Sequence, residues 1–116
     1  MSENDCLFCR IVDGNLSADI VYENDSLIAF RDINPKAPTH ILLIPRSHIA
    51  TMNDLEDGDK ALVGELFVTA ARIAADEGLA DDGYRVVMNY NAAAGQSVFH
   101  IHLHLMGGRT MTWPPG

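Results

Sequence analysis

The sequence predicts an α+β domain with a mostly antiparallel sheet. Short β-rich runs follow one another at hairpin spacing along the chain, and one long segment, from about Leu55 to Asp76, carries apolar residues at helical spacing. A chain of 116 residues is long enough for one compact domain and too short for two. We therefore expect a single domain over residues 1–116, with residues 1–4 flexible and residues 109–116 forming a C-terminal tail.

The first third of the chain predicts a short helix followed by a β-hairpin. The helix is expected over Cys6–Val12, between Asp5 as its N-cap and Gly14 just past its end. Two β-rich runs follow, Ile20–Glu23 and Leu27–Arg31. An Asn-Asp-Ser sequence separates them, and these are turn-forming residues, so the two runs are expected to pair as a hairpin.

The remaining elements alternate between strands and one helix. A near-continuous apolar strand is expected at His40–Pro45, after a loop that contains two prolines. The apolar stripe of the long helix needs a sheet or a partner to cover it, and Gly78 fits the position just past its end. Tyr84–Met88 is the next expected strand, residues 89–97 form a loop, and His100–Leu105 is the last strand.

The last expected strand carries the strongest functional signal. His100, His102 and His104 alternate with aliphatic residues, so a strand would place the three imidazoles on one face, roughly 6–7 Å apart. Two interpretations compete, a metal site and nucleophilic or acid–base catalysis by a central imidazole. Ligands of one zinc ion lie within about 4 Å of each other. Three histidines along one nearly straight strand therefore cannot easily share an ion.

Two nearby segments favour the catalytic interpretation. Gly95-Gln96-Ser97 precedes the histidines and offers backbone N–H groups and a hydroxyl that can bind phosphate oxygens, although it can also be a plain connection. Asp32 stands where a strand meets the proline-containing loop, and a carboxylate there could accept hydrogen bonds from two ribose hydroxyls. On its own Asp32 would more often be a solvated turn residue.

Composition limits the partners and the compartment. The formal net charge of -8 argues against a general nucleic-acid binder and against adhesion to anionic membranes. No apolar run is long enough to span a membrane, and the acidic, polar start of the chain is unlike a secretory signal. We expect an intracellular, cytoplasmic protein, in which Cys6 and Cys9 are thiols or metal ligands rather than a disulfide.

Several motifs together resemble one known family. Residues 100–106 resemble the HIT motif, His-φ-His-φ-His-φ-φ, in which φ is hydrophobic. Four further stretches are similar to the HINT branch, the histidine triad nucleotide-binding proteins: Ala29–Pro35, Ala37–His40, Gly95–Phe99, and Gly107–Arg109 with the terminal Trp113–Gly116. The resemblance extends over nearly the whole chain from Cys6 onward.

The resemblance implies a HIT fold, with a five-stranded sheet that extends across a homodimer. It also implies hydrolysis of purine nucleoside 5′-phosphoramidates, the activity of a phosphoramidase that cleaves P–N bonds through a nucleotidyl-histidine intermediate, with no cofactor required for catalysis. Three alternatives remain: a nucleotide-binding or scaffold protein with little catalysis, a dinucleoside polyphosphate hydrolase, and a zinc hydrolase centred on the three histidines. Asn91–Ala94 departs from the family pattern, since this part of the loop usually carries more glycine.

Residue roles follow from the resemblance by position. His102 resembles the nucleophile, and His40, His100 and His104 resemble its supporting histidines, with Ser97 beside them. The remaining positions resemble nucleotide contacts: Asn89, Gly95, Gln96 and Ser97 near the phosphate, Asp32 at the ribose, and Leu7, Phe8, Ile11, Phe30 and Ile33 around the base.

The two cysteines suggest a second site. Family members that carry a C-x-x-C pair resemble zinc proteins in which two histidines complete the ligand set, and here these would be His48 and His100 with Cys6 and Cys9. Two thiolates and two imidazoles suit a closed, structural tetrahedral zinc site. The alternative is that both cysteines are buried thiols at the edge of the base pocket.

Overall fold

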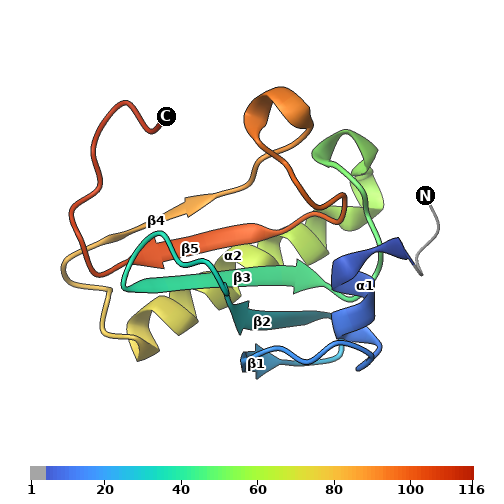
Figure 1. The fold of residues 1–116 in the computed structure, drawn as a ribbon, viewed down its shortest axis with the longest axis horizontal. Helices are drawn as coiled ribbons and strands as arrows, with labels where there is room; N and C mark the ends of the chain where they lie inside the picture. Colours follow the sequence, from blue (N-terminus) through green and yellow to red (C-terminus); the bar gives the residue numbers. More distant parts are fainter. Residues whose placement is uncertain (1–4) are drawn as a thin grey trace.

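A computed structural model describes residues 5–116 and confirms the α+β fold class (Figure 1). The expectation that residues 1–4 are flexible lies outside the described part. Along the chain the helices and strands are α1 (Leu7–Val12), β1 (Ile20–Glu23), β2 (Leu27–Arg31), β3 (Thr39–Pro45), α2 (Lys60–Asp76), β4 (Tyr84–Val87) and β5 (Leu103–Gly107). The strands form one five-stranded sheet in the order β1-β2-β3-β5-β4, and every neighbouring pair is antiparallel.

The expected hairpin between β1 and β2 is confirmed at both of its strands. Asn24 closes the turn, because its side-chain oxygen accepts hydrogen bonds from the backbone N–H of Ser26 at 2.8 Å and of Leu27 at 3.0 Å. An asparagine side chain can imitate a backbone turn in this way. The polar residues between the two β-rich runs therefore fix the register of the sheet's first two strands.

The expected starts of both helices are wrong. Cys6 rather than Asp5 is the N-cap of α1, since its sulfur accepts from the backbone N–H of Cys9 at 3.4 Å. The long helix begins at Lys60 rather than near Leu55, because the Asp59 carboxylate accepts from the backbone N–H of Glu56 and holds residues 57–59 in a tighter 3₁₀ turn. The expected helix end is confirmed, and Gly78 has the left-handed φ of 78° there.

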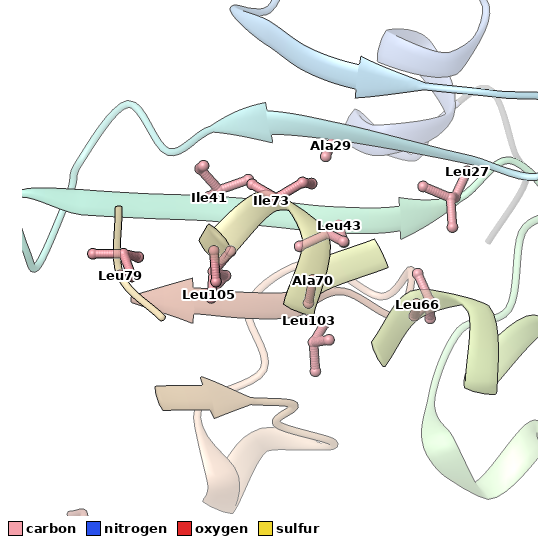
Figure 2. Close-up of a cluster of buried hydrophobic side chains, with 11 residues drawn as sticks. Leu27, Ala29, Ile41, Leu43, Leu66, Ala70, Ile73, Leu79, Leu103 and Leu105 are labelled. Carbon is pink, nitrogen blue, oxygen red and sulfur yellow. The ribbon is translucent and has the colours of Figure 1, made fainter. Parts of the chain in front are cut away.

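The core lies between the sheet and α2. Strand alternation directs one set of side chains toward this helix, among them Ala29, Leu43 and Leu105, while α2 contributes Ala70 and Ile73. Figure 2 shows these side chains converging between the helix and the three central strands. Each fully buried large aliphatic side chain contributes about 1.5–3 kcal/mol relative to an exposed one. This layer anchors the strands that carry the site.

The opposite face of the sheet carries α1 and is only partly covered by it. Phe8 and Ile11 of α1 pack on Phe30, Leu42 and Ile44 in a second apolar cluster. Because α1 has six residues, it covers one end of this face and leaves the rest for the functional groups (Figure 1). Among residues 5–116, no helix has the length and apolar character needed to span a membrane.

The last strand is shorter than expected. It begins at Leu103, so His100 and His102 lie in the segment before it rather than within it. The register would pair residue 101 with Pro45, which has no N–H to donate to a ladder. The Ile101 N–H instead donates to the carbonyl of Ile49 at 2.8 Å. Residues 100–102 therefore lie outside the ladder, and β5 starts only after them. Their backbone can adopt a conformation that is not a strand.

Candidate functional site

A cavity of about 280 Å³ opens on the sheet face beside α1. Its wall includes side chains from α1, β2, β3, the loop after β2 and the segment before β5. Most of the residues expected around a nucleotide line it: Leu7, Phe8, Ile11, Phe30, Asp32, Ile33, Ser97, His102 and His104. The cavity thus combines apolar side chains with Asp32, Ser97 and two of the histidines.

One hydrogen bond fixes the tautomer of His102. Its Nδ1 lies 2.8 Å from the backbone carbonyl of His100, and because a carbonyl only accepts, Nδ1 carries the proton. In the neutral ring Nε2 then keeps its lone pair. The ring edge of Phe8 packs on this imidazole, with centroids 5.0 Å apart and planes at 85°. His102, which lines the cavity, therefore has one ring nitrogen free to act as a nucleophile.

A second chain of hydrogen bonds fixes His40 and His104. The Lys36 backbone N–H donates to Nδ1 of His40 at 3.0 Å, so the proton of neutral His40 is on Nε2. That nitrogen donates to Nδ1 of His104 at 2.9 Å. His104 consequently carries its own proton on Nε2 and can act as a donor. The register of β3 and β5 sets His104 opposite Leu42, which places it on the cavity face.

Burial keeps these histidines neutral. Desolvation lowers the pKa of His102, and it lowers the pKa of His100 and of His104 to about 4. The pKa of His40 is also lowered, because desolvation outweighs the attraction of the nearby Asp32 carboxylate, which lies 3.5 Å from its Nε2. Near pH 7 the site therefore offers uncharged imidazoles with defined donor and acceptor nitrogens.

Asp32 and Ser97 both line the cavity. One carboxylate oxygen of Asp32 accepts from the Asn34 backbone N–H at 2.8 Å, which orients the carboxylate at the start of its loop. Near Ser97, Gly95 has a φ of 94°, a left-handed conformation that favours glycine. This conformation ends the short 3₁₀ turn Ala92–Ala94 and leads the chain back toward the histidines.

Asn89, Gly95 and Gln96 do not line the cavity wall, although all three are expected nucleotide contacts. Gln96 faces inward and braces the loop. Its amide donates to the carbonyl of Ala50 at 2.7 Å, and its oxygen accepts from the backbone N–H of Asn91 at 2.7 Å. Because its polar atoms are engaged within the chain, Gln96 shapes the loop that presents Ser97.

The cavity also has lining residues that sequence reasoning missed. They are Ser17, Ala18, Arg31, Asn34, Leu42 and Val98. Alternation along β3 could have predicted Leu42, since this residue lies on the same face of the strand as His40. Ser17 and Ala18 precede β1 in an irregular segment, where no periodicity indicates a direction. Ile33, which is 92% exposed, stands at the rim rather than inside.

Cys6, Cys9, His48 and His100 converge behind the cavity, with their ligand atoms all within 4.8 Å of each other. Nδ1 of His100 lies 3.4 Å from the sulfur of Cys6 and 3.5 Å from that of Cys9, and Nδ1 of His48 lies 3.2 Å from Cys9. A tetrahedral zinc site requires sulfur–nitrogen separations of about 3.5 Å. The Nε2 proton of His100 goes to the Pro45 carbonyl at 2.8 Å, which leaves Nδ1 free as a ligand. The four residues therefore fit a zinc ion.

Asp32, His40 and His104 form a second cluster with the same spacing limit of 4.8 Å. Its hydrogen bonds disfavour a metal, since Nε2 of His40 bears the proton when Lys36 donates to Nδ1. A metal there would need that nitrogen deprotonated and the Lys36 contact broken. In this cluster His40 accepts from Lys36 and donates to His104, which fixes the tautomers of both rings.

Comparison with known proteins places these features in a family context. The model of the HIT domain family matches residues 13–111. An uncharacterised HIT-like protein of Synechococcus elongatus is 50% identical over 116 residues, which is 100% of both chains. The purine nucleoside phosphoramidase of Escherichia coli K12 is 49% identical over 105 residues, covering 90% of this chain and 88% of the relative.

Solved structures agree with the sequence relatives. A HIT family hydrolase from Legionella pneumophila Philadelphia 1 is 54% identical, with a TM-score of 0.95, covering 97% of this chain and 100% of the other. A histidine triad protein from Clostridium difficile is 37% identical, with a TM-score of 0.92 and 97% of both chains covered. The similarity extends over nearly the whole fold.

The lowered pKa values predict that the metal-free protein loses stability in mild acid. The unfolded chain binds more protons than the folded chain between pH 6.5 and about 4, so stability falls as pH decreases through that window. Urea unfolding in the presence of a chelator should give a free energy of unfolding about 2–4 kcal/mol lower at pH 5 than at pH 7.5.

The variant His104→Gln is the control for this pH effect. It removes one titrating group, so the same change of pH should cost it less stability than it costs the parent protein. Equal stability of the parent at the two pH values would show that the imidazoles titrate normally.

Proposed function

The chain belongs to the HIT domain family, and we propose that it is a HINT-type nucleotide hydrolase that cleaves the P–N bond of purine nucleoside 5′-phosphoramidates. One observation carries the proposal. The unprotonated Nε2 of His102 belongs to a cavity that also holds the Asp32 carboxylate and the Ser97 hydroxyl. The phosphoramidase of E. coli K12, at 49% identity, supports the same class of reaction.

The cavity suits a nucleoside monophosphate group in one orientation. Phe8, Ile11 and Phe30 give an apolar end for the flat base. Asp32 has acceptor capacity for ribose hydroxyls, and Ser97 lines the same cavity as His102 and His104, where its hydroxyl could bind the phosphate. In this proposal phosphorus lies next to His102 and the leaving amine faces solvent.

The proposed reaction has two displacements at phosphorus. Nε2 of His102 attacks, a histidine–phosphorus bond forms, and the P–N bond to the amine breaks. The departing nitrogen takes up one proton, which His104 conveys from solvent, so that a neutral amine leaves. Water then attacks the nucleotidyl-histidine, which releases the nucleoside monophosphate, restores neutral His102 and returns one proton. This route uses groups of the chain and water.

We propose that a structural Zn²⁺ binds Cys6, Cys9, His48 and His100, because their donor atoms already have the separations that a tetrahedral ion needs. When bound, the ion would crosslink α1 to the segments that carry His48 and His100. Its thiolate ligands require reduced cysteines, which supports a cytoplasmic location as a further part of the proposal.

We also propose a homodimer in which the sheet continues across the β4 edge. β4 is a terminal strand of the sheet, so its outer edge has backbone groups that can pair with a second chain. Exposed apolar side chains also favour association, since Phe67 and Val68 on α2 are 46% and 53% exposed and Tyr84 on β4 is 39% exposed.

Replacement of His102 tests the assigned nucleophile. His102→Ala and His102→Gly should retain AMP binding, because the base and ribose contacts remain, while hydrolysis of adenosine phosphoramidate falls by several orders of magnitude, about 10⁴-fold or more. Steady-state rates and AMP titration by calorimetry measure the two effects separately. Hydrolysis at the parent rate by either variant would disprove the mechanism, and AMP binding without turnover in the parent would favour a binding protein instead.

The pH dependence of kcat/KM tests the protonation state of the site. The pKa of His102 is lowered by burial, so the nucleophile stays neutral down to about pH 6.5 and is lost by protonation only below it. We expect kcat/KM to be constant from pH 8 to about pH 6.5 and to decrease at lower pH, after subtraction of uncatalysed hydrolysis. A decrease that is already complete at pH 7 would contradict a neutral, buried imidazole.

A further inference from the structure

The short helix α1 belongs to two sites at once. Cys6 at its N-cap and Cys9 in its first turn belong to the metal-ligand cluster, whereas Leu7, Phe8 and Ile11 line the nucleotide cavity. A helix of six residues is far too short to be stable alone, so its position depends on these contacts. An interaction that fixes Cys6 and Cys9 therefore also fixes the wall of the cavity that α1 forms.

His100 makes the second connection between the two sites. Its ring faces the sulfurs of Cys6 and Cys9 through Nδ1 and is fixed from behind by the Pro45 carbonyl. Its own backbone carbonyl accepts the Nδ1 proton of His102 at 2.8 Å. One residue thus contributes a side chain to the metal cluster and a main-chain oxygen to the nucleophile.

Phe8 of α1 contacts residues of both sites. Its ring packs edge-on against His100, with centroids 6.0 Å apart, and against His102, with centroids 5.0 Å apart. It also contacts Phe30, with centroids 5.6 Å apart, in the apolar end of the cavity. A shift of α1 would therefore move a ring that touches the nucleophile, the metal-ligand histidine and the base pocket.

From these contacts we propose that metal binding at Cys6, Cys9, His48 and His100 and nucleotide binding in the cavity are coupled, each raising the affinity for the other. The coupling rests on the proposed nucleotide function. The metal would fix α1 and the main chain at His100, and a bound nucleotide contacts the same elements from the other side. The second ligand to bind then has less ordering to impose. Reciprocity requires one coupling factor for both ligands.

The test measures both affinities on the full-length protein. Calorimetry gives the Kd of AMP for the zinc-loaded and the chelator-treated protein, and a chromophoric chelator gives the Kd of zinc with and without saturating AMP. We expect AMP to bind about tenfold more weakly without zinc, and zinc to bind more tightly with AMP by that same factor. Circular dichroism establishes that the metal-free protein is folded.

Two variants at one position provide matched controls, since His48 does not line the cavity. His48→Ala should bind AMP with the affinity of the metal-free parent, whether or not zinc is added. His48→Cys replaces one zinc ligand with another and should recover the dependence of AMP affinity on zinc. The imidazole ¹⁵N spectrum gives a direct readout, because zinc removal should shift the His102 resonances while the hydrogen bond to His100 keeps the proton on Nδ1.

Several outcomes would overturn the coupling. These are equal AMP affinity with and without zinc, failure of the parent to bind zinc, and a metal-free protein that is unfolded, since the zinc dependence would then report folding alone. If AMP binds in both states with the same Kd, the proposed function stands and only the coupling fails. If AMP binds in neither state, the proposed function fails and the coupling with it.

Discussion

The hydrogen bond from His102 Nδ1 to the His100 carbonyl is the interaction on which the site depends. It holds the proton on Nδ1 and leaves Nε2 with the lone pair that the proposed nucleophile needs. That carbonyl is available because the sheet ends before it: Pro45 cannot continue the ladder, and Ile101 is held by Ile49 instead. Because the sheet ends at Pro45, the His100 carbonyl can accept from His102 Nδ1, and Nε2 is the nitrogen of His102 that keeps its lone pair.

Desolvation is the larger electrostatic effect in this site. Although the chain has a net charge of -8 and Asp32 lies beside His40, burial outweighs the attraction of the carboxylate and lowers the pKa of His40, His102 and His104. A neutral imidazole can attack phosphorus without first losing a proton, and the His40–His104 pair supplies a defined donor. The apolar side chains of the cavity thus help to keep the histidines uncharged.

Much of this arrangement could be predicted from sequence, because alternation and turn chemistry are local. The hairpin around Asn24 and the helix end at Gly78 were predicted correctly, and many of the residues expected at a nucleotide site line one cavity. Three features were not predicted. The start of β5 and the inward direction of Gln96 depend on partners that are distant in the sequence. The N-cap of α1 depends on competition between two adjacent residues, Asp5 and Cys6. Ser17 lines the cavity, but it lies in an irregular segment whose direction no sequence pattern indicates.

The central claim is that His102 attacks phosphorus through Nε2. Rapid acid-free quenching during turnover of a slow phosphoramidate, followed by peptide mapping and ³¹P NMR, would identify the residue and the nitrogen that carry the nucleotidyl group. The hydrogen bond to His100 predicts a single adduct on Nε2 of His102. An adduct on Nδ1 of His102 or on another histidine, or turnover without any covalent adduct, would contradict this account.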